Sequence, residues 1–362
     1  MAEATTGMVG RGFYDQHSEF QRRVAERAGA ALAELAGRVT LPPDSEGGAF
    51  GVADYGCAEG RNSIATVGRV LDAVAKRCPT GSALEMFVVH NDLPSNDFAT
   101  LLANLAAPGS YLAARPEVRV LLAPRSFFER VVPLGTIRFG TSDSAAHWLS
   151  RQPPGLDLPH GLYRSDAPPA ELAKILAQAA ADWRAFLAAR AEELVPGGVL
   201  LVQMLGADLA GPEPRVSAAG LMRLMAGCLE QLVGEGLVRR EVYAGWCFPV
   251  VPRTLEECLA PVREGPLAGA FEVVRCELTP VPSPYEEAFA RTGDTTTFAR
   301  DYAAFARAFS ETSLAAGLFT PSGADPKVAA DHLYGLMQVR LRADPEAYPF
   351  DDLTLTVALQ RR

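Results

Sequence analysis

Residues that could bind a ligand stand directly after an apolar run near the start of the chain. Asp54 directly follows this run, which covers 50–53. Gly56 and Gly60 follow in the pattern Asp-x-Gly-x-x-x-Gly, and glycine lets a backbone turn tightly and approach a ligand without a Cβ clash. Asn62 and Ser63 stand where a helix would begin, so the free backbone N–H groups of that helix can face a ligand. The spacing differs from Gly-x-Gly-x-x-Gly, which disfavours a nicotinamide oxidoreductase.

Polar and aromatic residues follow the next two apolar runs. Asp92 ends the second run, and an acidic residue there can accept hydrogen bonds from both ribose hydroxyls of an adenosine. The alternative is a turn in which Asp92 and Asn96 cap the following helix. After the third run, Ser126 could hydrogen-bond an adenine edge and Phe127 could stack on its face. The alternative for Phe127 and Phe128 is packing in the core, as aromatic pairs commonly do.

An imidazole and an indole are adjacent at His147 and Trp148. The indole has one N–H donor on a large apolar plate, so Trp148 could wall a pocket for an aromatic acid and donate to its carboxylate. A structural place in the core is the alternative for both residues.

Alternating strands and helices must position these residues. Such alternation predicts an α/β fold with a parallel, doubly wound sheet, in which ligands bind outside the carboxyl ends of the strands. The predicted strands cover 50–55, 83–91, 118–123, 136–142 and 199–205, and the predicted helices cover 18–38, 62–77, 96–105 and 170–194.

The pattern changes in the C-terminal half. Helices are predicted over 216–233 and most of 282–342, an irregular apolar segment over 245–252, and strands over 271–278 and 353–359, the last able to pair on the sheet edge. We therefore expect a core sheet with a mostly helical cap made by two separate stretches. The expected division is an N-terminal segment plus core (1–205), cap (206–265), core strand (266–281), cap (282–348) and C-terminal core strand (349–362).

Composition excludes several classes of protein. The 362 residues are 48% hydrophobic with a net charge of −9, which disfavours nucleic acid as a partner because phosphate binding needs clustered Lys and Arg. No apolar run is long enough for a membrane span, and no signal peptide is found. The six cysteines form no Cys-x-x-Cys pair, which indicates reduced thiols in a cytoplasmic protein. The five histidines lack metal-ligand spacing, so no metal site is expected.

The order of these motifs resembles the SABATH family of carboxyl methyltransferases. That family uses S-adenosylmethionine (SAM) to methylate salicylate, benzoate, jasmonate, indole acetate and xanthine nitrogens. The resemblance implies a Rossmann-like class I SAM methyltransferase sheet with a helical cap, and a homodimer. The matching positions are Tyr14, Ser18 and Gln21, followed by 53–62, 91–98, 126–128, 147–150 and 193–198.

The resemblance also implies residue roles. The methionine part of SAM would be held by Ser18, Asp54, Gly56, Cys57 and Asn62, with Tyr14 near the sulfonium. The ribose and adenine would be held by Asp92, Leu93, Ser126 and Phe127. The substrate carboxylate would be held by Gln21 and Trp148, with His147 beside them. S-adenosylhomocysteine (SAH) would be the product.

Three positions depart from the family pattern. Ser144 stands where relatives often have Tyr, which leaves a larger or differently shaped pocket. Asparagines are absent from 158–163 and 246–249, where some plant members contribute to a magnesium site, so a magnesium requirement is doubtful. The composition, rich in Ala and Arg with few lysines, suggests a high-GC bacterial source.

The predicted reaction is an in-line displacement at the SAM methyl carbon by a carboxylate oxygen. A carboxylic acid has a pKa near about 4, so no general base is needed. The pocket walls are predicted to come from Trp246, Phe248, Phe305, Phe309 and Met337, which favours an aromatic or otherwise apolar acid.

Two other functions stay open. An enzyme of the same fold could methylate nitrogen or a phenol oxygen, and His147 is then the nearby candidate for removing the proton. A non-catalytic protein that binds SAM or another metabolite is the second alternative.

Overall fold

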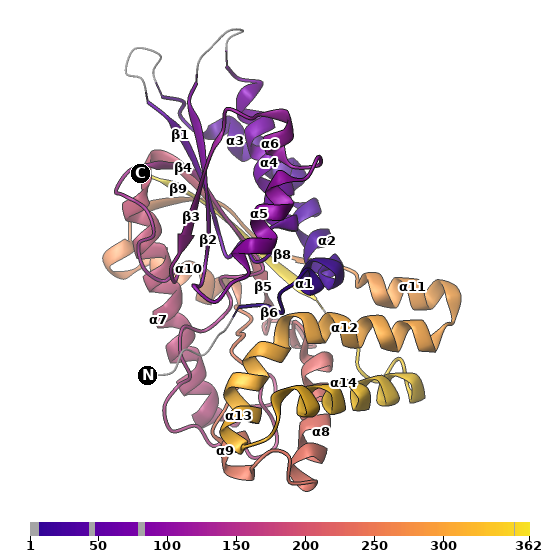
Figure 1. Ribbon diagram of the computed structural model, residues 1–362. Coiled ribbons are helices and arrows are strands. Elements are labelled where there is room, and N and C mark those ends of the chain that lie inside the picture. Colours follow the sequence, from indigo (N-terminus) through magenta and orange to yellow (C-terminus); the bar gives the residue numbers. More distant parts are fainter. Residues whose placement is uncertain (1–6, 43–47, 79–83, 351) are drawn as a thin grey trace.

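A seven-stranded sheet forms the centre of the computed structural model, and a group of helices lies at one end of the sheet (Figure 1). The structure describes residues 7–42, 48–78, 84–350 and 352–362, so parts of the predicted segments 1–205 and 349–362 and residue 83 of a predicted strand lie outside it. In spatial order the strands are β3 (Arg119–Pro124), β2 (Met86–Asp92), β1 (Phe50–Tyr55), β4 (Ile137–Asp143), β5 (Leu194–Leu205), β9 (Leu353–Arg361) and β8 (Phe271–Pro280).

Strands β1 to β5 are mutually parallel, as the sequence predicts for a doubly wound sheet. Strand β9 runs antiparallel to both β5 and β8. The sequence suggests that β9 could pair on the sheet edge, but it lies between two strands. Leu355, Val357 and Leu359 are almost fully buried, and a strand this apolar is stabilised by cover on both sides.

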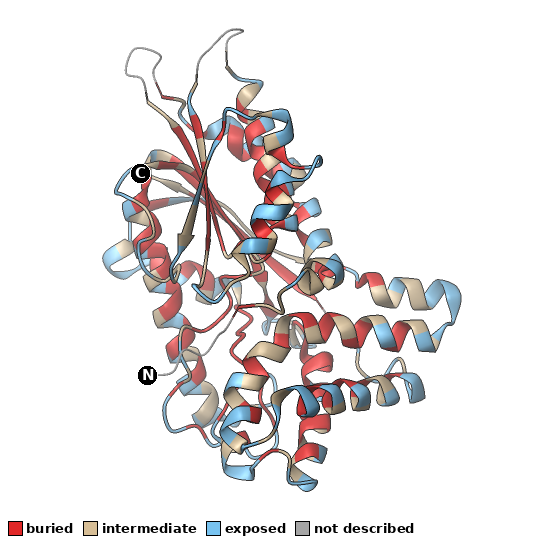
Figure 2. Ribbon diagram, viewed as in Figure 1, coloured by how far each residue is buried: buried red, intermediate tan, exposed pale blue. Residues whose placement is uncertain are grey.

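The central strands are buried between helices that cover the two faces of the sheet (Figure 2). Alternate residues of these strands pack against the helices of opposite faces. Val52 faces α3, α4, α5 and α6, whereas Ala53 faces α7 and α10. The bounds are α3 (Gly29–Arg38), α4 (Arg61–Ala75), α5 (Phe98–Ala106), α6 (Tyr111–Ala114), α7 (Pro169–Glu193) and α10 (Leu255–Arg263), with the 3-10 turn η2 (Gly265–Leu267) after α10.

Two short helices precede the sheet. Helix α1 (Phe13–His17) leads into α2 (Glu19–Arg27), and α2 joins α3 through Ala28. The single helix predicted over 18–38 is therefore two helices, and glycine, which is a weak helix former, begins the second one at Gly29.

The remaining helices form the cap beyond the carboxyl ends of the parallel strands (Figure 1). In the cap, α12 packs on α14, and α14 packs on α8. Its elements are α8 (Ala219–Gly234), α9 (Arg240–Ala244), α11 (Pro284–Thr292), α12 (Thr295–Leu314), the π-helical turn η3 (Ala315–Phe319), α13 (Thr320–Ser322) and α14 (Pro326–Ala343), and a small hairpin of β6 (Ala207–Asp208) and β7 (Arg215–Val216) precedes α8.

The predicted cap segment 206–265 does not coincide with the cap helices throughout. Helix α10 forms the C-terminal end of this predicted segment, and it packs on α7 and β8. Its Cys258, Leu259 and Val262 belong to the core on that face of the sheet. Helix α10 is thus part of the core layer, because its apolar face meets the sheet.

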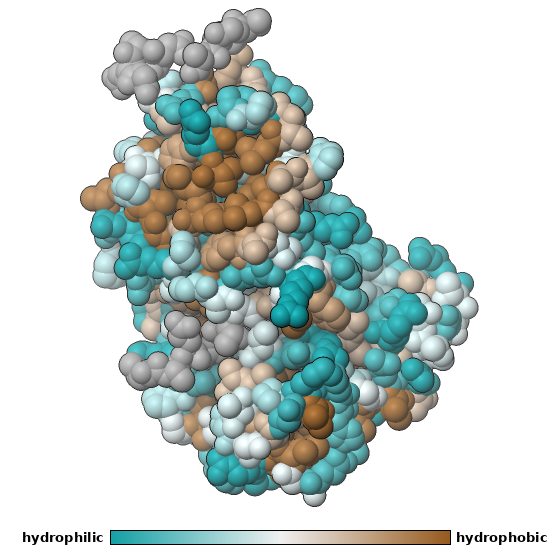
Figure 3. Space-filling view, in the orientation of Figure 1, coloured by the Kyte–Doolittle hydropathy of each residue, from teal (hydrophilic) through white to brown (hydrophobic). Residues whose placement is uncertain are grey.

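Apolar side chains gather on the face of the molecule shown in Figure 3, over the region where β3 forms the sheet edge. Leu121 of β3 and Leu102 of α5 are each 51% exposed.

The homodimer implied by the family resemblance stays a prediction. No helix in the described ranges combines the length and the apolar character that crossing a membrane requires.

Candidate active site

A large, partly open cavity lies between the carboxyl ends of the parallel strands and the cap, with about 1130 Å³ of empty space that includes the solvent at its mouth. A small cavity, with about 370 Å³ of empty space that likewise includes solvent, adjoins it beside the turn after β1. The two cavities are neighbouring parts of one site, because both are lined by Tyr14, Gln21, Gly56, Ala58 and Asp143.

The turn after β1 requires glycine where the sequence places it. Gly56 has φ of +95°, and a Cβ there would lie 2.3 Å from the Cβ of Ala145. The N–H groups of Gly56 and Cys57 both donate to the carbonyl oxygen of Asn91, at 2.9 and 3.0 Å. The turn is therefore fixed to the end of β2, and Cys57 is buried in the wall of the small cavity.

Asp92 and Leu93 line the large cavity after β2. Asp92 Oδ2 accepts a hydrogen bond from the Ala58 N–H at 2.7 Å, and Oδ1 accepts one from the Leu93 N–H at 2.8 Å. Burial raises the pKa of Asp92 to about 6 in spite of these two bonds. Each oxygen keeps a lone pair for a ligand. The N-cap of α5 is Asp97, so neither Asp92 nor Asn96 has the capping role weighed as an alternative.

Ser126 and Phe127 line the same cavity, in the loop after β3. The Phe127 ring also packs on Phe128 and Phe186, with centroid distances of 4.7 and 5.7 Å. Phe127 therefore packs against other aromatic rings, as the core alternative expects, and also lines the cavity; its stacking on adenine stays a prediction.

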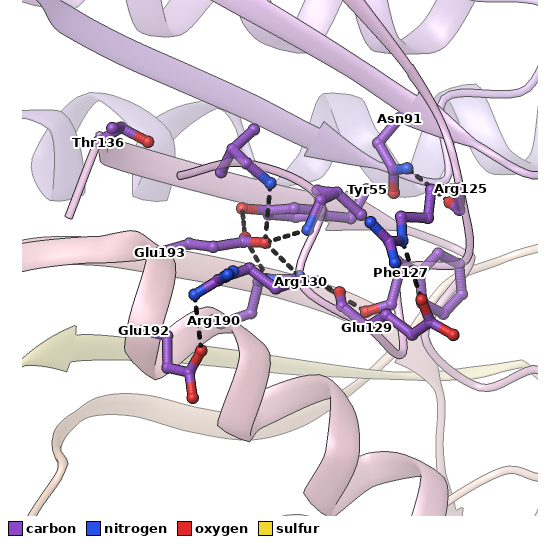
Figure 4. A network of polar contacts seen from close by, with 12 residues as sticks. Tyr55, Asn91, Arg125, Phe127, Glu129, Arg130, Thr136, Arg190, Glu192 and Glu193 are labelled. Atoms are coloured by element: carbon purple, nitrogen blue, oxygen red, sulfur yellow. Dashed lines mark hydrogen bonds and ion pairs between the residues drawn. The ribbon is translucent and has the colours of Figure 1, made fainter. Parts of the chain in front are cut away.

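A fully buried ion pair fixes this loop (Figure 4). Arg190 Nε donates to Glu193 Oε2 at 2.8 Å, and the same guanidinium donates to the carbonyl oxygens of Phe127 and Glu129, each at 2.9 Å. The Tyr55 hydroxyl donates to Glu193 Oε2 at 2.7 Å. Removing one partner of such a buried pair commonly costs about 3–5 kcal/mol. The sequence motif contained Glu193 but gave no sign of Arg190.

The N-terminal helices bring two predicted residues to the site, because Tyr14 and Gln21 line both cavities. Ser18 is buried and lines neither cavity, but it accepts a hydrogen bond at 3.3 Å from Nδ2 of Asn62, which lines the small one. Burial raises the pKa of Tyr14, so its phenol is protonated at neutral pH. Glu59, which the sequence analysis missed, holds the segment in place.

The carboxylate of Glu59 spans the gap between the turn after β1 and the start of α1. Oε1 accepts from the Gly12 N–H at 2.6 Å, and Oε2 accepts from the Asp15 N–H at 3.0 Å. These bonds hold helix α1 beside the turn.

Trp148 lines the large cavity, with its ring centroid 5.8 Å from that of Phe248. Its backbone forms an antiparallel bridge with Val250, and the Ser150 N–H donates to Asp182 Oδ2 at 2.9 Å. These contacts fasten the segment that carries Trp148 to α7 and to the irregular apolar segment.

His147 lines the large cavity as a neutral ring. The Leu205 N–H donates to His147 Nδ1 at 3.1 Å. Burial and the nearby Arg253 lower the pKa of His147 to about 3.

Two buried acids lie close together beside the turn. Asp54 lines the small cavity, and burial followed by repulsion from Asp143 raises the pKa of Asp54 to about 8. Asp143, which the sequence analysis left unassigned, lines both cavities. Among the residues that the structure describes, no three His, Cys, Asp or Glu side chains are grouped so as to hold a metal ion.

The cap supplies only part of the predicted wall. Phe248, Phe305 and Phe309 line the large cavity, but Trp246 and Met337 do not. The Trp246 ring packs on Phe248, 5.9 Å between centroids, and Met337 is fully buried in the cap core. The sequence analysis marked Ser144 as a position that shapes the pocket and included Phe128, Leu149 and Ser150 in the matching motifs, and all four line the large cavity. No sequence signal marked the remaining wall residues, which are Met8, Phe20, Ala145, Leu205, Ala218, Met222, Val250 and Phe350.

Comparisons with known proteins agree with this arrangement. The model of the family described as SAM dependent carboxyl methyltransferase matches residues 4–325. A jasmonate O-methyltransferase of Arabidopsis thaliana is 28% identical over 294 residues, which are 74% of each chain. A 3,7-dimethylxanthine N-methyltransferase of Camellia sinensis is 30% identical over 260 residues, 68% of this chain and 70% of the relative.

A fungal relative and a solved structure extend the comparison. An O-methyltransferase of Aspergillus aculeatus is 31% identical over 274 residues, 74% of this chain and 70% of its own. The structure of a loganic acid methyltransferase with SAH covers 99% of this chain and 98% of its own with a TM-score of 0.79 at 23% identity, which confirms the fold. The chain therefore belongs to the SABATH family of carboxyl methyltransferases and is a SAM-dependent methyltransferase.

Proposed function

We propose that this methyltransferase transfers the methyl group of SAM to the carboxylate of a small, apolar organic acid. The observation that carries the proposal is the hydrogen bond of His147. Because the Leu205 N–H donates to His147 Nδ1, that nitrogen is an acceptor. The proton of the neutral ring then sits on Nε2, and neither nitrogen has a lone pair free to take a proton from a substrate.

A site whose imidazole is not free to act as a base suits a nucleophile that is already ionised. The pKa of His147 is lowered to about 3, so the ring is neutral at pH 7. A carboxylic acid, with a pKa near about 4, is ionised at that pH. A neutral N–H or phenol O–H group needs help to lose its proton.

Neutral donors orient the substrate carboxylate in this proposal. Gln21 and Trp148 line the large cavity beside His147, and each offers N–H groups to an anion. SAM supplies an electrophilic methyl group when it is bound. Neutral donors align a carboxylate oxygen without the strong ground-state stabilisation that a Lys or Arg partner would give.

The groups after β1, β2 and β3 fit SAM, and we call them the cofactor side. Asp92 keeps acceptor positions for the ribose hydroxyls, and Ser126 and Phe127 offer an adenine edge contact and a ring face. Asp54 and the glycine turn lie where a cationic methionine portion would be held. The same groups would hold the product SAH.

The rest of the large cavity, which we call the acceptor side, suits an apolar body on the acid. Its walls include Phe248, Phe305 and Phe309. Buried aromatic rings stabilise apolar ligands through contact area and ring packing. Two similar proteins, named a jasmonate O-methyltransferase and a loganic acid methyltransferase, carry names of organic acids.

Nitrogen methylation is the second candidate function. The Camellia sinensis N-methyltransferase is about as similar to this chain as the jasmonate enzyme is, at 30% against 28% identity. Identity at this level does not separate the two acceptor types. The state of His147 favours the carboxylate.

The test is a panel of acceptors incubated with the protein and SAM. Each aromatic or terpenoid acid is paired with its primary amide, which has the same body and no ionised carboxyl group. Xanthines and phenols complete the panel, and mass spectrometry before and after alkaline hydrolysis separates methyl esters from N-methyl products. We expect esters from acids and no product from amides. Methylation of xanthines alone, or of no acceptor, would contradict the proposal.

A further inference from the structure

Asp143 ends strand β4 at the junction of the two cavities. Asp143 Oδ2 accepts a hydrogen bond from the Thr66 hydroxyl at 3.0 Å. The other oxygen, Oδ1, is buried and has no hydrogen-bond partner among the residues that the structure describes. A buried acceptor left in this way destabilises the folded protein, unless a ligand provides a donor.

The surrounding protein does not neutralise this carboxylate by direct contact. Arg69 on α4 attracts Asp143 through space, while its Nη1 donates to the carbonyl oxygen of Ala25 at 3.3 Å. Asp54, whose carboxylate is also buried, lines the same small cavity and repels Asp143. Two buried acids facing one small cavity are stabilised most effectively by a cation placed between them.

We propose that Asp143, together with Asp54, binds the ammonium group of the methionine portion of SAM. The unpartnered oxygen needs an N–H or O–H donor, and the ammonium carries three. The sulfonium is positively charged but has no such donor. An ionised acceptor carboxylate has none either, and it would be repelled by Asp143.

This role is distinct from acid–base catalysis on the acceptor. Asp143 shares the small cavity with Gly60, Asn62 and Ser63, which lie at the turn after β1 and the start of α4, away from the cap. The aromatic rings of the acceptor side line only the large cavity. The inference rests on SAM as the methyl donor and is independent of which acceptor is methylated.

The test measures binding, so it does not depend on knowing the acceptor. Calorimetry at pH 7.5 compares wild-type protein with Asp143→Asn, which keeps the shape and the Thr66 contact but removes the charge. Each protein is titrated with SAH and with the analogue of SAH that lacks the α-amino group. We expect Asp143→Asn to weaken SAH binding by about 10-fold or more and to change binding of the analogue by less than about twofold.

A matched variant separates a local role from a general loss of the site. Asp92→Asn, at the predicted ribose contact, should weaken both ligands equally. Equal weakening of both ligands by Asp143→Asn would mean a structural role and would overturn the proposal. Unchanged SAH affinity in Asp143→Asn would also overturn it.

Discussion

The cofactor side and the acceptor side of the site are built differently. The cofactor side consists of short loops that follow consecutive strands, and its polar groups are fixed by backbone hydrogen bonds such as those to Asn91 and Asp92. The acceptor side is made of apolar rings from segments far apart in the chain, for example Phe20, Phe248 and Phe305. Donors at Gln21 and Trp148 stand between the two.

This difference indicates how each side tolerates change. A hydrogen bond is lost when one of its atoms moves, and the buried polar group that stays unpaired then lowers stability or affinity. Apolar contacts scale with area and can be rearranged, so substitutions there change affinity by smaller steps. We therefore expect the cofactor side to be intolerant and the acceptor side to tune the choice of acid.

The most severe test of this comparison is Gly56→Ala. The new Cβ would meet Ala145 at 2.3 Å, and φ of +95° is unfavourable for alanine. We expect SAM affinity, measured by calorimetry, to fall by roughly 100-fold through strain and overpacking. Gly135→Ala is the matched control, since φ there is also positive but no atom lies within 4 Å of the new Cβ. Wild-type affinity in Gly56→Ala would show that the turn can relax.

Trp148→Ala tests the donors that lie between the cofactor side and the acceptor side. Loss of the indole removes both wall and donor, so kcat/KM for the acid should fall by about 10- to 100-fold while the Kd of SAM stays unchanged. Steady-state kinetics with the best acid of the panel provides the measurement. Trp148→Phe keeps a ring and removes only the N–H, so activity as high as wild type in that variant would exclude the donor role.

The pH dependence of SAM binding sharpens the electrostatic part of the comparison. Asp54 has its pKa raised to about 8, so the folded protein without SAM binds a proton that the unfolded chain releases. Protonated Asp54 therefore contributes to the free energy of unfolding at low pH, and this contribution is lost as the pH rises toward about 8. A cationic ligand favours the ionised carboxylate, so SAM affinity should rise about tenfold between about pH 6 and 8.

Calorimetry of SAM binding across this range checks the sign. Asp54→Asn should flatten the profile, because the amide does not titrate. A wild-type affinity that falls as pH rises would contradict the assignment of the cation to these acids.

The smallest expected effect belongs to the acceptor side. Phe309→Ala removes a ring from the apolar wall and enlarges the cavity. The KM for a well-fitting acid should therefore rise by up to about 10-fold, with the Kd of SAM unchanged. Larger acids should lose less than smaller ones. A change in SAM affinity in this variant would mean that the two sides are coupled.

Local pattern determined the cofactor side. The strand–turn–helix around Gly56 was predictable because glycine, a buried strand and a helix start are all properties of neighbouring residues. The placement of Asp92 after β2 followed for the same reason. The sequence alone therefore established the α/β fold, the family and the positions of most strand-end groups.

Tertiary structure decided everything that depends on segments distant in the chain. Only the sheet order puts β9 between β5 and β8, and only packing turns Trp246 away from the large cavity. The unpartnered oxygen of Asp143 and the hydrogen bond from Leu205 to His147 are likewise invisible in the sequence. Hydrophobicity specifies that a side chain is buried, but it does not specify its neighbours, and those neighbours determine the chemistry of the site.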